Sequence, residues 1–139
     1  MTDVLIDSNV LLDIFTEDPR WFQRSAAVLA ALAGDHDLIV NPIVYAEVSV
    51  NFERIEELDV ALPGDSFRRE ALPWEAAFLA GKCFVRYRRA GGVRRAPLPD
   101  FYIGAHAAVA GHTLLTRDAR RYRHYFPKLR IVAPSRRLP

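Results

Sequence analysis

Short runs dominated by aliphatic residues recur along this chain and are separated by stretches with helical character. They cover residues 4–6, 38–40, 113–115 and 129–132. A strand that is apolar on both faces is typical of a parallel sheet with helices packed on either side. The alternation of these runs with helical stretches therefore predicts an α/β fold built on a mainly parallel sheet.

Helix signals fill the segments between the apolar runs. The sequence predicts helices over 10–18, 22–33, 42–58, 74–89 and 100–110, a short helix after Asp118, and a short strand at 71–72. Pro42 stands at a first helical position, and Gly34 and Gly111 follow predicted helix ends. Loops are expected over 59–66 and 91–99. A chain of 139 residues has room for one domain, which we place over 1–133, with 134–139 as a loosely ordered tail.

Cysteine content and hydropathy narrow the class of protein. The single cysteine, Cys83, excludes an internal disulfide and a cysteine-rich zinc site, and we expect it to be a buried thiol. No apolar run approaches the length that crosses a membrane. Asp3 and Asp7 interrupt the first apolar run, unlike a secretory signal. These features predict a cytoplasmic protein.

The net charge of +2 hides a strong division of charge along the chain. Residues 1–79 contain 5 arginines against 15 acids, a net charge of −10, whereas residues 80–139 contain 14 lysines and arginines against 2 acids, a net charge of +12. The basic half predicts an anionic partner, with nucleic acid as the first candidate. Mutual neutralisation of the two halves within the fold is the alternative, and both can hold.

Acidic residues fall where the predicted strands end. Asp7 directly follows the run 4–6, and Asp118 lies two residues beyond Thr116, which follows the run 113–115. Glu47 lies in the helix after the run 38–40, and Asp100 opens its helix. Ligands of open α/β sheets bind at the carboxyl ends of the strands, so we expect these four carboxylates to converge.

Each acid also has an ordinary explanation as a helix cap or a surface charge. Glu47, however, lies between Val44 and Val48 on the apolar side of its helix, and Asp100 and Asp118 are the only acids in the basic half. Converging carboxylates repel one another unless a cation neutralises them, and ligand sets made only of oxygen suit Mg²⁺ or Mn²⁺. Such an ion can polarise a phosphodiester and lower the pKa of a water molecule. The pattern therefore predicts a metal-dependent phosphodiesterase.

Four segments in order carry a resemblance to a known family: VLIDSNVLLDIF, NPIVYAEVS, PLPDFYIGAHA and LLTRDARRYRHYFP. Together they span residues 4–126, and they resemble PIN domains, specifically the VapC-type toxins of prokaryotic toxin–antitoxin pairs. The resemblance implies a three-layer α/β/α sandwich around a mainly parallel sheet of four to five strands. It further implies an endoribonuclease that uses Mg²⁺ or Mn²⁺, dimerises, and is silenced by a VapB-like antitoxin.

The same resemblance assigns roles to particular residues. Asp7, Glu47, Asp100 and Asp118 would be the catalytic, metal-binding acids. Polar residues beside them would orient these ligands, and they are Ser8, Asn9 and Thr116.

Arginines beside the predicted site are candidates for RNA binding. Five of them flank the pair Gly91-Gly92 just before Asp100, and one lies beside Asp118: Arg86, Arg88, Arg89, Arg94, Arg95 and Arg117. We predict that they contact the RNA backbone, with a solvated basic loop as the alternative. The four histidines show no pair at metal-ligand spacing and are expected in the core or on the surface.

Two other functions compete with the nuclease. A non-catalytic RNA-binding module would use the basic half alone, but it would gain nothing from acids near phosphate. A phosphohydrolase of the haloacid-dehalogenase type requires a second aspartate where this chain has Asn9. The intact set of carboxylates favours the nuclease.

Overall fold

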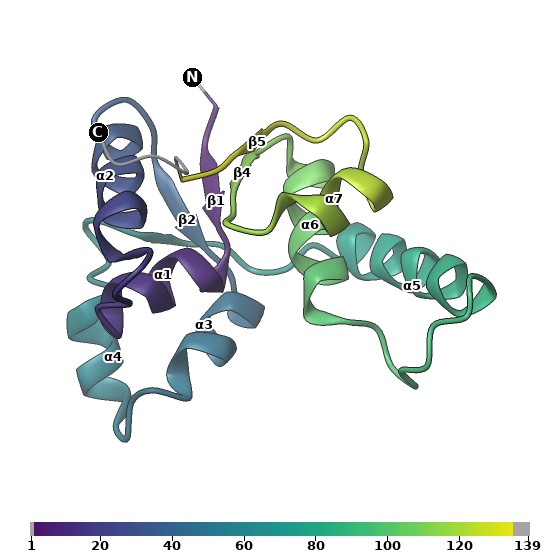
Figure 1. The fold of residues 1–139 in the computed structure, drawn as a ribbon, viewed down its shortest axis with the longest axis horizontal. Helices are drawn as coiled ribbons and strands as arrows, with labels where there is room; N and C mark the ends of the chain where they lie inside the picture. Colours follow the sequence, from purple (N-terminus) through teal and green to yellow (C-terminus); the bar gives the residue numbers. More distant parts are fainter. Residues whose placement is uncertain (1, 135–139) are drawn as a thin grey trace.

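The computed structural model describes residues 2–134, and its centre is a sheet of five parallel strands (Figure 1). The strands are β1 (Val4–Ile6), β2 (Leu38–Val40), β3 (Arg68–Arg69), β4 (Thr113–Leu115) and β5 (Ile131–Val132), in the spatial order β3-β2-β1-β4-β5. The predicted parallel sheet of four to five strands is confirmed.

Strand β1 lies in the middle of the sheet, where the direction of the strand order reverses. Its residue Val4 pairs with Leu38 of β2 on one side and with Thr113 of β4 on the other. The chain thus builds outward from β1 to β3 and then returns to the opposite side of β1. The crevice beyond the carboxyl ends of β1 and β4 is the topological switch point, where ligands of open α/β sheets bind.

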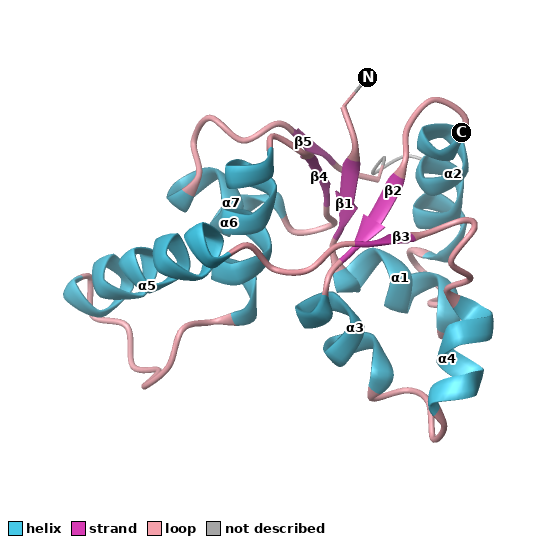
Figure 2. Cartoon of the chain, turned by 180° about the vertical axis from the view of Figure 1, so that it is seen from behind, coloured by secondary structure: helices cyan, strands magenta, loops and turns pink. Residues whose placement is uncertain are grey.

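Helices cover both faces of the sheet. They are α1 (Ser8–Phe15), α2 (Phe22–Ala33), α3 (Pro42–Ser49), α4 (Ile55–Ala61), α5 (Trp74–Arg89), α6 (Pro99–Ala110) and α7 (Ala119–Tyr125). Figure 2 shows α1 and α2 on one side of the strands and α5, α6 and α7 on the other. This arrangement is the predicted three-layer α/β/α sandwich. None of the helices within residues 2–134 is long and apolar enough to span a membrane.

Helix α6 is buried on nearly every side, which explains its apolar sequence. Phe101, Ile103 and Ala105 are fully buried, as expected for a helix that lies between the sheet and its neighbours. Gly104 lets helix α7 approach closely, because a Cβ atom there would overlap the Phe126 ring and lie 3.0 Å from the Tyr122 ring. The glycine therefore sets how near the aromatic side chains of the α7 segment come to α6.

The predicted helix over 42–58 is wrong, because the segment forms two helices, α3 and α4. The amides of Asn51 and Phe52 bond to carbonyls three residues back, which tightens the chain and ends α3. The Phe52 ring then packs edge-on against Phe15 of α1, with ring centroids 5.6 Å apart. A contact between distant segments overrides the local helical pattern here.

The predicted strand at 71–72 is also wrong, because the strand in this region is β3, three residues earlier. Both residues of β3 are exposed arginines at the edge of the sheet. Arg68 forms ion pairs with Asp3 at 2.5 Å and with Asp37 at 2.9 Å. An edge strand held by charged side chains carries no apolar signal, so its pattern gave no indication of a strand.

The remaining boundaries differ by a few residues. The first helix covers Ser8–Phe15 rather than 10–18, and α4 extends to Ala61 into the predicted loop. Cys83 is buried, as expected. Most of the predicted tail, residues 135–139, lies outside the described residues.

Candidate active site

Asp7 lies at the switch point, and its side chain is held by hydrogen bonds from three neighbouring residues. It directly follows β1 and caps α1, where its Oδ1 accepts a hydrogen bond from the amide of Ser8 at 2.8 Å. Its Oδ2 accepts from the Thr116 hydroxyl at 2.8 Å and from the Tyr122 hydroxyl at 2.9 Å. The side chain is 3% exposed. These donors fix the carboxylate in one orientation.

Two further acids reach the same place through shared donors. The Ser8 hydroxyl donates to Glu47 Oε1, on α3, at 3.0 Å. Asp100, in the first turn of α6, has its Oδ1 3.2 Å from the Tyr122 hydroxyl, and its Oδ2 accepts from Arg121 at 3.3 Å. The structure therefore brings Asp7, Glu47 and Asp100 together from three separate elements.

The pKa values of two of these acids are raised by burial and by the charges of neighbouring carboxylates. Burial raises the pKa of Asp7 to about 6, the hydrogen bond from Thr116 opposes the rise, and the charges of Asp100 and Glu47 add to it. Burial also raises the pKa of Glu47, with a smaller contribution from Asp100. Deprotonated carboxylates in this arrangement repel one another, and a bound cation would relieve that repulsion.

Asp118 differs from the other three acids in its contacts. It occupies the N-cap position of α7, is exposed, and makes no side-chain hydrogen bond within residues 2–134. Its backbone amide donates to the Thr116 hydroxyl at 3.1 Å. Asp118 is thus linked to the site through its backbone, and no hydrogen bond within residues 2–134 joins its carboxylate to Asp7.

The three polar residues expected beside the acids form one hydrogen-bonded chain. Asn9 donates to the Thr116 hydroxyl at 3.3 Å and accepts from the amide of Arg117 at 3.1 Å. The Thr116 hydroxyl in turn donates a hydrogen bond to Asp7, and Ser8 is bonded to both Asp7 and Glu47. The carboxyl ends of β1 and β4 are thereby joined directly through side chains.

Most of the arginines expected to bind RNA lie on one segment that leads into the site. Arg86, Arg88 and Arg89 form the last turn of α5, and Arg94 and Arg95 follow in the loop before α6. Within this segment Arg88 donates to the carbonyl of Arg94 at 3.0 Å. The loop brings positive charge up to Asp100.

Arg117 has a different environment. Its Nε lies 3.4 Å from Asp13, and its guanidinium lies over the Trp21 ring, 5.2 Å from the centroid. The side chain is therefore committed to contacts within the protein.

Tyr122 is a residue of the site that the sequence reasoning missed. It lies on α7, is 1% exposed, and places its hydroxyl between Asp7 and Asp100. The available signal was its position on the buried face of a short helix together with Phe126. A buried tyrosine hydroxyl usually has a hydrogen-bond partner, and the nearby acids were the candidates.

A second cluster, away from the acids, joins Glu70 to two histidines. Glu70 Oε1 accepts from Nε2 of His106 at 2.8 Å and from Nε2 of His112 at 2.7 Å. The three ligand-type atoms lie within 4.8 Å of one another. Burial raises the pKa of Glu70, but the hydrogen bonds and charges of His112 and His106 outweigh it and hold the pKa at about 2.

The protonation of His106 distinguishes a hydrogen-bonded cluster from a metal site. Asn41 Oδ1 accepts from the amide of Val44 at 2.9 Å, so its amide nitrogen faces Nδ1 of His106 at 3.0 Å. Nδ1 must then be an acceptor, and the proton lies on Nε2, where it is donated to Glu70. A metal bound at Nε2 would require the opposite tautomer. The contacts favour a structural network.

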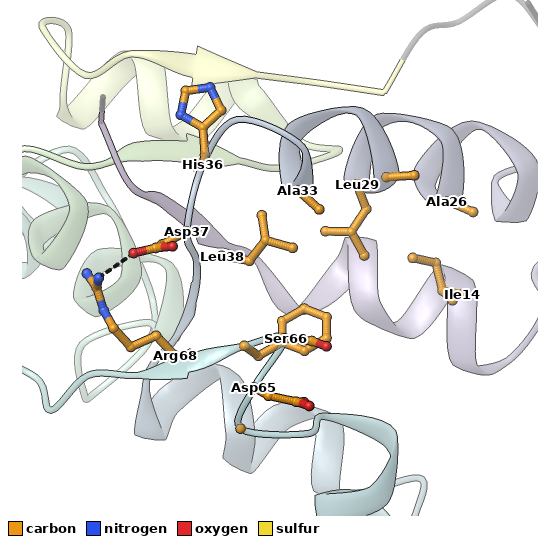
Figure 3. Close-up of a pocket in the computed structure, with 13 residues that line it drawn as sticks. Ile14, Ala26, Leu29, Ala33, His36, Asp37, Leu38, Asp65, Ser66 and Arg68 are labelled. Carbon is orange, nitrogen blue, oxygen red and sulfur yellow. Dashed lines mark hydrogen bonds and ion pairs between the residues drawn. The ribbon is translucent and has the colours of Figure 1, made fainter.

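The cavity shown in Figure 3, of about 720 Å³, lies elsewhere in the molecule. It is bounded by α2 and by the segments that precede β2 and β3, with Leu29 and Leu38 among its lining residues. This is the amino-terminal side of those strands. None of the four predicted acids lines it, so it is separate from the acidic site.

The fold and the site define an α/β protein with an acidic crevice at the switch point of a parallel sheet. A family model described as PIN domain matches residues 4–127, and the chain belongs to this family, whose members are generally nucleases. A search of curated protein sequences gave no significant match.

Solved structures of toxin–antitoxin complexes share the fold. VapBC2 from Rickettsia felis, bound to a promoter DNA fragment, aligns with a TM-score of 0.71 at 17% identity, over 95% of this chain and 98% of that one. VapBC-1 from nontypeable Haemophilus influenzae gives 0.69 at 16% identity, over 94% and 96%. FitAcB from Neisseria gonorrhoeae gives 0.64 at 20% identity, over 92% and 95%. At these identities the likeness concerns the fold.

Proposed function

We propose that this protein is a Mg²⁺- or Mn²⁺-dependent endoribonuclease that acts in the cytoplasm as the toxin of a type II toxin–antitoxin pair. The observation that carries the proposal is the meeting of Asp7, Glu47 and Asp100 at the switch point, where burial raises the pKa of Asp7 to about 6. Membership of the PIN family supports it.

The residues present fit a hard divalent ion. The candidate ligands are carboxylate oxygens whose repulsion a cation would relieve, and such sets suit Mg²⁺ and Mn²⁺. Asp7, Glu47 and Asp100 would hold the ion, with the exposed Asp118 as the proposed fourth acid. When bound, the ion supplies Lewis-acid chemistry, polarising the phosphodiester and lowering the pKa of water.

The chain's own residues hold the ligands and the substrate. Ser8 and Thr116 orient Asp7, and Ser8 also fixes Glu47. The arginine segment from Arg86 to Arg95 binds the phosphates of the RNA through charge-assisted hydrogen bonds. We propose that Arg117, which is tied to Asp13, acts mainly by holding the Asn9 and Thr116 contacts in place.

Substitution of the acids tests the nuclease assignment. Asp7→Asn and Asp100→Asn should each lower RNA cleavage by about a hundredfold or more, because each removes a charged ligand while keeping the side-chain shape. Asp65→Asn, at an exposed acid away from the site, is the matched control. Full cleavage by either site variant would contradict the assignment. RNA binding without any cleavage by the wild type would favour a non-catalytic module.

The histidines bear on which group attacks the phosphate. Ribonucleases that use the 2′-hydroxyl of RNA commonly employ a histidine pair as acid and base. His106 and His112 are both bonded to Glu70, and His36 bonds to the carbonyl of Thr2 at 2.6 Å. We therefore expect attack by water, which leaves 5′-phosphate and 3′-hydroxyl ends. Ends with a 2′,3′-cyclic phosphate would contradict this mechanism.

An antitoxin would act on the same acids. Carboxylates without a metal are a suitable receptor for the planar fork of an arginine, so we propose that a VapB-like partner inserts an Arg or Lys side chain into the crevice. Co-purification with the product of an adjacent small gene, with loss of RNase activity, would support this. Harmless expression of the protein alone, with no such neighbouring gene, would contradict the toxin role.

Helix α5 presents the surface that we propose for a homodimer. Trp74, Phe78 and Val85 lie on one side of the helix and are 89%, 69% and 39% exposed. Phe78 and Val85 are equally far from the point between Gly81 and Lys82. An antiparallel pair of α5 helices related by a twofold axis at that point therefore places Phe78 against Val85 of the second copy.

The proposed pairing rests on this apolar stripe of Trp74, Phe78 and Val85. Glu75 and Arg88 are also equidistant from the proposed axis, but helical periodicity places them on opposite flanks of the stripe. An antiparallel twofold pair sets each flank against the same flank of the second copy, so these two charges do not pair across the interface.

A charge in the apolar stripe tests the dimer. Phe78→Glu should convert the protein to monomers in sedimentation experiments at micromolar concentration, because it buries a charge against Val85 of the second copy. Val60→Glu on α4, where the valine is 80% exposed, is the control. A monomeric wild type, or a Phe78→Glu protein that remains dimeric, would contradict the proposed interface.

A further inference from the structure

The Tyr122 hydroxyl is the one group that touches the carboxylates of both Asp7 and Asp100 among the hydrogen bonds of residues 2–134. It lies 2.9 Å from Asp7 Oδ2 and 3.2 Å from Asp100 Oδ1. It reaches them from α7, whereas the two acids come from the end of β1 and the start of α6. A neutral side chain thus bridges the buried Asp7 and the partly exposed Asp100.

One hydroxyl serves two carboxylates there. A phenol has a single proton, so Tyr122 can donate to only one of the acids at a time. Burial, together with the charges of Asp7 and Asp100, raises the pKa of Tyr122 well above its usual value, so the phenol keeps that proton. Asp7 Oδ2 also accepts from Thr116, which leaves this oxygen with two donors already bound.

The ring of Tyr122 is buried and closely packed. The side chain is 1% exposed and packs over Gly104 of α6, where even an added Cβ atom would lie 3.0 Å from the ring. Packing therefore holds the hydroxyl beside the two carboxylates.

We propose that Tyr122 is a positioning residue that weakens the binding of a divalent cation, because its hydroxyl stabilises the Asp7–Asp100 pair without metal. The inference rests on the proposed function, since it takes these two acids as ligands of the ion. Loss of the hydroxyl leaves the facing carboxylates with one donor fewer. This raises the free energy of the metal-free protein more than that of the metal-bound protein, and tighter metal binding follows.

The test is a titration of the full-length protein with Mn²⁺ alone, without RNA, following free Mn²⁺ by electron paramagnetic resonance. Tyr122→Phe should bind Mn²⁺ about five- to tenfold more tightly than the wild type, a change in the range of a typical hydrogen bond. Tyr125→Phe is the matched control. Tyr125 lies on the same helix, and its hydroxyl makes no side-chain hydrogen bond in the described part of the chain. Its affinity should stay within twofold of the wild type.

Thermal melting in EDTA provides a second readout that does not depend on metal. Tyr122→Phe should melt at a lower temperature than the wild type in EDTA, and saturating Mn²⁺ should raise its melting temperature by more than it raises that of the wild type. Because phenylalanine preserves the ring that packs on Gly104, the variant keeps the steric contacts of α7. A folded Tyr122→Phe protein that binds Mn²⁺ as well as or less tightly than the wild type would overturn the inference.

A third variant separates this inference from the proposed function. Asp7→Asn should abolish Mn²⁺ binding if the acids are the ligands. If Asp7→Asn abolishes binding and Tyr122→Phe leaves it unchanged, only the role of Tyr122 is contradicted. If neither the wild type nor Tyr122→Phe binds Mn²⁺, the proposed function fails, and this inference fails with it.

Discussion

At the scale of single residues, Asp7 combines the demands of structure and function. Its carboxylate caps α1 and joins β1 to β4 through Thr116, yet it lies beside two other acids. In the absence of metal, the deprotonated carboxylate is costly to the folded state. The best-placed acid of the site is therefore also a source of instability.

This cost predicts an unusual pH dependence in EDTA. The pKa of Asp7 is about 6 in the folded protein against an ordinary value of 3.8, so the folded state binds the proton more tightly. This group's contribution therefore favours folding at low pH and is lost as the pH rises from about 4 through 6. Asp7→Asn should raise the free energy of unfolding by about 1–3 kcal/mol at pH 7 and by much less at pH 4.

Urea denaturation at both pH values checks this prediction. Asp65→Asn, at an exposed acid outside the site, should change stability by less than about 0.5 kcal/mol at either pH. An equal effect of Asp7→Asn at pH 4 and pH 7 would show that its charge is not the cause. Saturating Mg²⁺ should reverse the order of stability, because the wild type then gains a ligand that the variant binds poorly.

The sequence predicted some members of the site better than others. The sequence indicated that Asp7 belongs to the site because this residue directly follows an apolar strand. It indicated Asp100 because this acid stands at the start of a helix. Tyr122 and Glu70 escaped because their partners lie far away in the chain: Tyr122 bonds to a residue 115 positions earlier, and Glu70 to one 36 positions later. A local sequence pattern cannot reveal contacts between residues so far apart in the chain.

At the scale of elements, the Glu70 network joins the edge of the sheet to its covering helix. Glu70 follows β3, His106 lies on α6, and His112 precedes β4. Asn41, which caps α3, completes the network through His106. Four elements that are distant in sequence thus depend on one carboxylate.

Removal of that carboxylate should weaken the fold. Glu70→Ala leaves two buried histidines without their acceptor, which should lower the free energy of unfolding by about 2–4 kcal/mol at pH 7. Because the folded pKa of Glu70 is about 2, its contribution is present above about pH 4.5 and is lost as the pH falls toward 2. The difference between variant and wild type should shrink over that range.

The exposed Glu57→Ala on α4 is the control for this variant, and chemical denaturation from pH 7 to pH 2.5 is the measurement. A Glu70→Ala protein as stable as the wild type at pH 7 would mean that the network is dispensable. Cleavage activity distinguishes this network from the acidic site, because folded Glu70→Ala protein should retain it.

Contact between α6 and α7 should be equally sensitive to a small change. In Gly104→Ala the new methyl group would overlap the Phe126 ring, so α7 must shift, and we expect a loss of about 1–3 kcal/mol. Gly64→Ala is a matched control, because an added Cβ there meets nothing within 4 Å. Thermal melting of the two variants compares them directly, and equal stability would indicate that α7 adjusts without strain.

Elements with strong local signals were predicted well. The strands β1, β2 and β4 and the helix α5 match their expected ranges, because each has an unbroken apolar or helical pattern with clear end signals. The break between α3 and α4 was not predicted, since the packing of Phe52 on Phe15 decides it. The edge strand β3 was not predicted, since ion pairs rather than apolar residues hold it.

At the scale of the whole molecule, the acidic and basic halves of the chain meet at the candidate site. Asp7 and Glu47 come from the acidic half of the chain, whereas Asp100 and the arginine segment that leads to it come from the basic half. The fold places the two side by side at one edge of the sheet. A phosphate backbone held by the arginines would therefore lie against the acidic crevice.

This arrangement predicts the salt dependence of RNA binding. Arg89→Ala and Arg95→Ala should each weaken the binding of single-stranded RNA and lower the slope of log K against log salt by about 0.7. Arg54→Ala, at an exposed arginine on the opposite half of the chain, should leave the slope unchanged. Fluorescence anisotropy over a range of salt concentrations measures all three in the Asp7→Asn background, which prevents cleavage. Identical slopes would remove this segment from the RNA-binding surface.

The pairing of β1 with β4 also determines when the site can exist during synthesis. Asp7 leaves the ribosome well before its partner Thr116, which is 109 residues further along the chain. Tyr122 and α7 follow later still, and such non-local pairing forms late in folding. In a nascent chain that ends before β4, Asp7 lacks the side of the crevice that β4 and α7 form. The proposed nuclease site can therefore assemble only after β4 and α7 have left the ribosome.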